Sequence, residues 1–157
     1  MFERLKEQFH GDRVSAQRLL IPFVLEVGDL EASILRERTE DLSRFGFEIE
    51  PLGERSFAVH AVPTLLKSDD PAGLVLEVIG EMKEWEQAGE LQKKVDEVLS
   101  TIACHSAIRA HKFLDRGEVS ALLMDMDRTQ FSNHCPHGRP VSTEISQMEI
   151  ERMFRRR

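Results

Sequence analysis

The chain has 157 residues, of which 41% are hydrophobic and 31% are charged, a composition typical of one compact domain or of two small lobes. No apolar run approaches the roughly 20 residues needed to cross a bilayer, and the N-terminus lacks the apolar core of a signal peptide, so we expect a cytoplasmic protein. The formal net charge of -7 argues against tight DNA binding by this chain alone, because phosphate recognition needs clustered Lys and Arg.

The first part of the chain predicts a mixture of helices and strands. Residues 1–10 have apolar side chains at helical spacing, which predicts a short amphipathic helix. Residues 19–27 are apolar on both faces and predict a buried strand, in which Pro22 favours an edge position or a bulge. A helix is expected over 30–44. The segments 47–52 and 55–63 predict a hairpin around Gly53.

The second part is mainly helical by its pattern. Pro71 is expected to open a helix, because proline is favoured in the first helical turn. Longer apolar stripes predict helices over 90–110 and 118–131, and a last helix from Gln147 follows a short strand expected over 141–145. The sequence therefore predicts an α/β chain of the α+β type.

The segment 133–140, NHCPHGRP, holds a candidate metal site. Cys135 and His137 can give a thiolate and an imidazole to one zinc ion, and Cys104 could supply a third ligand. Further candidates in reserve are His105, His111 and His134. The alternative is that both cysteines are small core residues and the histidines lie on the surface. A Cys/His nucleophilic pair is disfavoured, because residues two apart do not easily face each other.

The segment QRLLIP, from Gln17 to Pro22, is a candidate docking motif. A glutamine followed by aliphatic residues and a proline can bind in the apolar groove of a partner as an extended segment. The alternative is that Leu19, Leu20 and Ile21 begin a core strand, since any buried strand has this composition. At the C-terminus, Arg155–Arg157 could contact phosphate or form a solvated, frayed end.

Five segments together resemble one known family, the C-terminal domain of the bacterial mismatch-repair protein MutL. In chain order they are QRLLIP (17–22), GFEIEPLGERSFAVHAVPTLL (46–66), ACHSAIRA (103–110), CPHGRP (135–140) and FRR (154–156). They occur in the order of the family and span essentially the whole chain. Neither short cysteine motif would identify the family alone, but the five segments in this order form a highly specific match.

The resemblance implies a fold and a set of partners. The family has a two-lobed fold, with a dimerisation and metal-site lobe expected over 1–15 and 91–157 and an external regulatory lobe over 16–90. A homodimer would join two N-terminal ATPase domains, which alone would bind ATP. The sliding clamp, the mismatch-recognition protein MutS and, weakly, DNA are the other expected partners, with no membrane. The location implied is cytoplasmic and nucleoid-associated.

The resemblance also assigns roles to individual residues. By residue-wise match, Cys104, Cys135 and His137 would bind zinc or manganese, in a domain that nicks the newly made strand. The clamp motif would be carried by Gln17, Leu20, Ile21 and Pro22. Possible accessory residues are Glu3, Arg139, Phe154 and Arg156.

One departure from the family pattern limits the expected activity. The nuclease branch has an Asp-Gln-His-Ala…Glu motif just before the helix that begins here at Met1, and those ligands are missing from this sequence. We therefore expect the catalytic carboxylates upstream of Met1 and an inactive chain by itself. The alternatives are a non-catalytic dimerisation and clamp-docking scaffold with a structural Cys-x-His loop, or a small zinc-stabilised binding domain.

Overall fold

The computed structural model describes residues 1–66, 70–83, 91–108, 112–129, 132–136 and 138–155. The chain divides into two compact units, Met1–Ala110 and His111–Arg157, and each is described here by itself. The first unit contains α1 (Phe2–Gly11), β1 (Ala16–Glu26), α2 (Asp29–Glu37), α3 (Thr39–Arg44), β2 (Glu48–Pro51), β3 (Ser56–Pro63), α4 (Pro71–Lys83) and α5 (Leu91–His105). The second contains α6 (Arg116–Arg128) and α7 (Gln147–Met153). The predicted α+β class is confirmed, and the division into the two predicted lobes stays a prediction.

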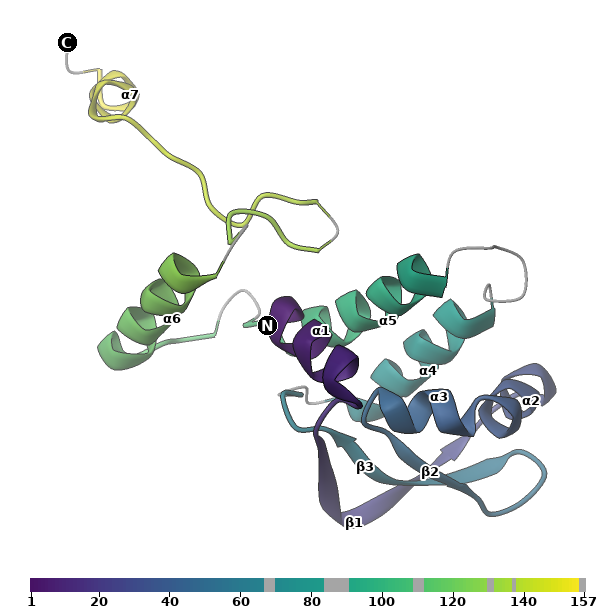
Figure 1. Cartoon of the computed structure of the whole chain (residues 1–157). Helices are drawn as coiled ribbons and strands as arrows, with labels where there is room; N and C mark the ends of the chain where they lie inside the picture. The colour runs from purple at the N-terminus through teal and green to yellow at the C-terminus, as the bar shows by residue number, and fades with distance from the viewer. Residues whose placement is uncertain (67–69, 84–90, 109–111, 130–131, 137, 156–157) are drawn as a thin grey trace. The chain divides into compact units, whose positions relative to one another are not determined.

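The sheet of the first unit has three antiparallel strands in the order β1-β3-β2. Strand β3 is the central strand. Its sequence, SFAVHAVP, suits this position because it is apolar on both faces, and most of its side chains are buried. The hairpin of β2 and β3 matches the predicted one. Figure 1 shows the helices of this unit on one side of the sheet. The strand order places β1 at an edge of the sheet.

The core lies between the sheet and these helices. Helix α1 contributes Leu5 and Phe9 at helical spacing, and the ring of Phe9 stacks on Phe45 with 4.8 Å between the ring centroids. Helices α4 and α5 contact each other, and α5 also contacts α1. The largest fully buried side chains are Phe45, Phe47, Phe57, Leu5, Leu42, Leu74, Ile79, Met82, Leu99, Ile102, Val14 and Val59.

Two predicted helices differ from those observed. The helix expected over 30–44 is divided into α2 and α3 at Arg38, where φ is -108° and ψ is 23°. At this break the hydroxyl of Thr39 donates to the carbonyl of Leu35 at 2.9 Å, a local bond that competes with a continuous helix. The helix expected over 90–110 ends at His105.

The second unit contains helices that are well capped but bury nothing. Each helix begins with a capping box. Asp115 and Glu118 form the one at α6, and Ser146 and Glu149 form the one at α7. Neither helix has a buried residue. The large apolar side chains that are exposed in this unit are Phe113, Val119, Leu122, Leu123, Met124, Val141, Ile145, Met148, Ile150, Met153 and Phe154.

The short strand predicted over 141–145 is wrong. These residues form no strand, and an isolated bridge between His134 and Pro140 is the extent of pairing described nearby. The backbone amide of Val141 donates to Asn133 at 2.9 Å, which closes a loop instead of extending a ladder. Pro140 has no backbone N–H to continue the pairing.

Within the described residues, no helix combines the length and the apolar character that crossing a membrane requires.

Candidate metal and docking sites

Strand β1 contains a bulge at the predicted docking motif. Arg18 pairs with Ala61 of β3 and Phe23 pairs with Val59, so the four residues 19–22 lie opposite a single residue of β3. Pro22 cannot donate to a strand ladder, which favours a bulge at an edge strand. The predicted edge or bulge at Pro22 is confirmed. The strand predicted over 19–27 is present as far as Glu26, but its predicted burial is wrong, because only Leu25 and Val27 of these residues are buried.

The bulge presents the apolar residues of the motif to solvent. The Leu20 side chain is 98% exposed and Ile21 is 80% exposed, while Gln17 and Pro22 are also exposed. Leu19 packs against the core and holds the start of the bulge to the sheet. Two aliphatic side chains this exposed side by side are unusual, because burial of each would stabilise the protein by about 1.5–3 kcal/mol. The arrangement can therefore give its apolar surface to a partner.

An ion pair lies beside the bulge. The Nε atom of Arg18 on β1 is 3.3 Å from Oε2 of Glu48 on β2, and both residues pair with Ala61 of the central strand. The small side chain of Ala61 lets the two longer ones meet above it. Both side chains are largely solvated, so the pair contributes little to stability. The backbone pairing of Arg18 with Ala61 marks the point at which the bulge begins.

Cys104 lies in the last turn of α5 with its side chain exposed. The residues just before it, Ile102 and Ala103, belong to the core. After it, the buried hydroxyl of Ser106 donates to the carbonyl of Ile102 at 2.8 Å and closes the helix end. The polypeptide around the thiol is therefore anchored on both sides.

His105, the neighbour of Cys104, forms a hydrogen-bonded contact with Glu77 in this structure. Its Nε2 atom is 3.0 Å from Oε2 of Glu77 on α4. The Nδ1 atom is buried and has no hydrogen-bond partner among the described residues. Sequence reasoning kept His105 as a reserve ligand and missed Glu77, since nothing in the pattern joins two residues so far apart in the chain.

Cys135 lies at the start of a tight loop that its own backbone closes. Its amide donates to the carbonyl of Arg139 at 2.8 Å, and its carbonyl accepts from the amide of Gly138 at 2.8 Å. Gly138 has φ 78°, a value that favours glycine. The side chain of Cys135 is half-buried. This loop can hold a thiolate in a fixed place, as a metal ligand requires.

The predicted metal ligands are only partly described. His137 and the accessory residue Arg156 lie outside the described residues, and Cys104 and Cys135 belong to different units. In the portion of the chain that the structure covers, no three His, Cys, Asp or Glu side chains form a group able to hold a metal ion. The other accessory residues, Glu3, Arg139 and Phe154, are exposed. The set of Cys104, Cys135 and His137 stays a prediction.

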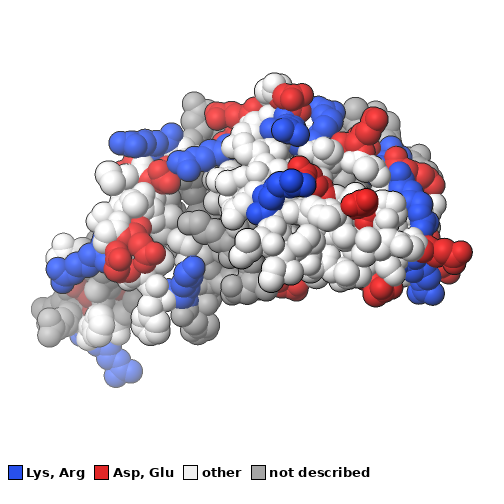
Figure 2. All heavy atoms as spheres, turned by 90° about the horizontal axis from the view of Figure 1, so that it is seen from below, with Lys and Arg blue, Asp and Glu red and all other residues white. Residues whose placement is uncertain are grey.

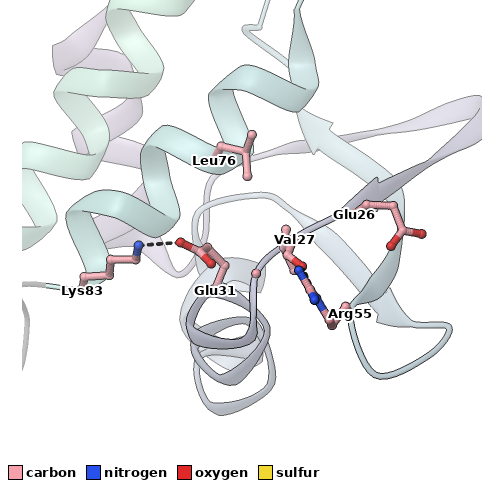
Figure 3. A pocket seen from close by; sticks show the side chains of 7 residues that line it. Glu26, Val27, Glu31, Arg55, Leu76 and Lys83 are labelled. Atoms are coloured by element: carbon pink, nitrogen blue, oxygen red, sulfur yellow. Dashed lines mark hydrogen bonds and ion pairs between the residues drawn. The ribbon is translucent and has the colours of Figure 1, made fainter.

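A shallow groove lies between the end of β1, the start of α2, and α4. Figure 3 shows the side chains that line it, including the ion pair of Lys83 with Glu31. The hydrogen bond from Lys83 lowers the pKa of Glu31 below its ordinary value. Arg55 donates to the carbonyl of Val27 at 2.9 Å. Since these charges pair within the protein, we do not assign the groove a ligand.

Comparison with known proteins gives the class of the chain. The model of a family of dimerisation domains, described as "MutL C terminal dimerisation domain", matches residues 1–114. The chain is also 41% identical over 155 residues to the DNA mismatch repair protein MutL of Geotalea uraniireducens (strain Rf4), covering 99% of this chain and 26% of the relative. Identity to the protein of the same name from Xanthomonas campestris pv. campestris (strain B100) is 40% over 155 residues, 99% of this chain and 25% of the relative.

The chain therefore belongs to the MutL C-terminal dimerisation domain family. It spans about a quarter of the length of the relatives that it matches.

Proposed function

We propose that this chain serves DNA mismatch repair as a C-terminal domain that joins two protein copies, docks on a sliding clamp and forms part of a metal-dependent nicking endonuclease. Its family membership supports the assignment to mismatch repair and the homodimer. In the full protein, ATP would bind to a separate N-terminal domain and MutS would recruit the assembly to a mismatch. The site of action would be the cytoplasm, at the nucleoid.

The bulge of β1 is the observation that carries the proposal. It exposes Leu20 and Ile21 next to each other on an edge strand, with Gln17 and Pro22 on either side. An extended segment of this kind binds an apolar groove with its aliphatic side chains, while the glutamine amide supplies hydrogen bonds. The sliding clamp is the partner that we assign to it.

The exposed apolar side chains of the second unit support dimerisation. Helix α6 presents Val119, Leu122, Leu123 and Met126 along one face, and none of its residues is buried. A unit of this size in which none of the described side chains is buried cannot repay the entropy of folding by itself. We infer that a second copy of the chain covers this face.

The donor set proposed for the metal fits zinc by its chemistry. Thiolates from Cys104 and Cys135 with an imidazole from His137 form a soft set that favours zinc over magnesium, and manganese is the alternative ion. When bound, such an ion polarises a phosphoryl oxygen and lowers the pKa of a water molecule. Arg139, exposed on the same loop as Cys135, would contact phosphate.

Weak DNA binding by the domain alone agrees with its surface. Figure 2 shows Lys and Arg side chains interspersed with Asp and Glu on the face that it presents, without one broad basic area. The net charge of -7 repels the DNA backbone. DNA would therefore reach the metal site through the clamp and the other domains.

Clamp-stimulated nicking of supercoiled plasmid tests the proposal. The full-length protein should nick in the presence of manganese, and adding the clamp should increase the rate. Leu20→Ala combined with Ile21→Ala should abolish the stimulation and leave the basal rate unchanged. Val24→Ala is the matched control, because Val24 is an exposed aliphatic residue of the same strand outside the bulge.

Two further variants test the proposed metal ligands in the same nicking assay. Cys135→Ala or His137→Ala should reduce basal nicking, with or without the clamp. Normal nicking by both variants would contradict the metal assignment and favour the second candidate, a non-catalytic dimerisation and clamp-docking scaffold.

A further inference from the structure

An enclosed histidine follows Cys104 directly in the chain. The side chain of His105 is 11% exposed, although its partner Glu77 is 62% exposed. The carboxylate of Glu77 can only accept, so the hydrogen between the two residues belongs to Nε2 of His105, 3.0 Å away. The other ring nitrogen, Nδ1, is buried without a partner among the described residues. The contact with Glu77 therefore holds the ring in one orientation.

The Glu77–His105 pair joins α4 to the last turn of α5, the turn that contains Cys104. Glu77 lies in α4 and His105 ends α5, and the two helices pack against each other. Ile102 anchors the preceding turn in the core, and Ser106 closes the helix end by its bond to that residue. The contact of His105 with Glu77 adds a tie from this turn to α4.

We propose that the Glu77–His105 pair positions the Cys104 thiolate for metal binding, a proposal that rests on the proposed metal site. A ligand that is held in place before the ion arrives loses less conformational freedom on binding. Groups that hydrogen-bond a metal ligand directly change metal affinity by about 10–100-fold, so we expect an effect at the lower end for a pair that acts through the neighbouring residue. His105 acts here through Cys104 and is a positioning residue.

Zinc affinity of the full chain tests this proposal, measured by competition with a chromophoric chelator. Glu77→Ala should weaken zinc binding by about 10-fold and alter the thiolate absorption bands of the cobalt-substituted protein. Glu77→Gln keeps an acceptor oxygen for Nε2 and should restore most of the affinity and the wild-type cobalt spectrum. His105→Gln should weaken binding in the same way as Glu77→Ala.

A second His–Glu pair provides the matched control. His60 and Glu50 in the sheet have 3.2 Å between Nε2 and Oε2, so Glu50→Ala removes the same kind of pair away from α5. It should leave zinc affinity unchanged. Equal weakening by Glu50→Ala and Glu77→Ala would overturn the proposal, because the effect would then be general.

Cys104→Ala separates failure of the positioning role from failure of the metal site. If Cys104→Ala weakens zinc binding and Glu77→Ala does not, the positioning role is overturned while the metal site stands. If Cys104→Ala leaves zinc affinity unchanged, the assignment of Cys104 to the metal fails, and the positioning role fails with it.

Discussion

Glu31 on α2 and Lys83 at the end of α4 form an ion pair with 2.6 Å between Oε1 and Nζ. The pair ties together two helices that contact each other, and both of its residues line the groove in Figure 3. The hydrogen bond from Lys83 is the main cause of the lowered pKa of Glu31.

We expect this pair to make stability depend on pH on the acid side. A carboxylate whose pKa is lower in the folded state stabilises that state above its unfolded pKa of about 4, and this contribution is lost as the pH falls through the folded pKa. Urea unfolding of wild type and Glu31→Gln should therefore differ near neutral pH and converge in acid. Glu40→Gln makes the same charge change at an exposed position of α3 and serves as control. A constant difference at every pH would contradict this assignment.

The stacked rings of Phe9 and Phe45 predict a large loss of stability on truncation. Phe45 is fully buried, and the guanidinium of Arg44 lies 4.4 Å from the ring centroid of Phe9. Phe45→Ala should lower the free energy of unfolding by about 3–5 kcal/mol because it leaves a cavity. Phe113→Ala removes the same ring from a side chain that is 99% exposed, and should cost less than about 0.5 kcal/mol. Denaturant unfolding measures both, and similar losses would be inconsistent with the described core.

Gly46 is a position where a side chain should be costly. Its φ is 90°, and an added Cβ would meet the carbonyl oxygen of Val14 at 3.2 Å. Gly46→Ala should destabilise the chain by about 1–2 kcal/mol. Gly80→Ala should have the opposite sign, with a gain of up to about 1 kcal/mol, because Gly80 lies within α4 with open space around it. Thermal melts of the two variants give the comparison.

The apolar face of α6 predicts the assembly state. Leu123→Glu places a charge on a face that we expect to be covered by a second copy, so it should shift the chain toward monomer. Sedimentation velocity over a range of concentrations measures the shift. Ser120→Glu adds the same charge at an exposed position of the same helix, outside the apolar stripe. An unchanged dimer in Leu123→Glu would exclude α6 from the interface.

Sequence patterns predicted most of the helices and the hairpin because local signals specify them. Apolar spacing indicated α1, and Pro71 and Gln147 begin α4 and α7 as expected. The strand over 141–145 failed because strands need a neighbour, and the pattern of one segment does not provide it. The break between α2 and α3 depends on a side chain that bonds to the backbone, which apolar spacing does not reveal.

The candidate sites were also predicted only in part from the sequence. The composition of QRLLIP alone favoured a core strand over a docking motif. The bulge of β1 against β3, with Leu20 and Ile21 exposed, shows that these two residues are not part of the core. The Glu77–His105 pair arises from the packing of two helices, so the sequence pattern contains no signal for it. Sequence reasoning placed Cys135 in a tight loop, as observed, but it placed Cys104 inside a helix that it extended to residue 110, whereas α5 ends at His105.

The bulge of β1 also has a consequence for solubility. An uninterrupted edge strand of this length would offer a row of unpaired amides and carbonyls to any other extended chain, a common route to aggregation. Residues 19–22 leave the plane of the ladder, so an incoming strand finds only short regular segments on either side. The same irregularity that exposes Leu20 and Ile21 thus protects the sheet from indiscriminate strand addition.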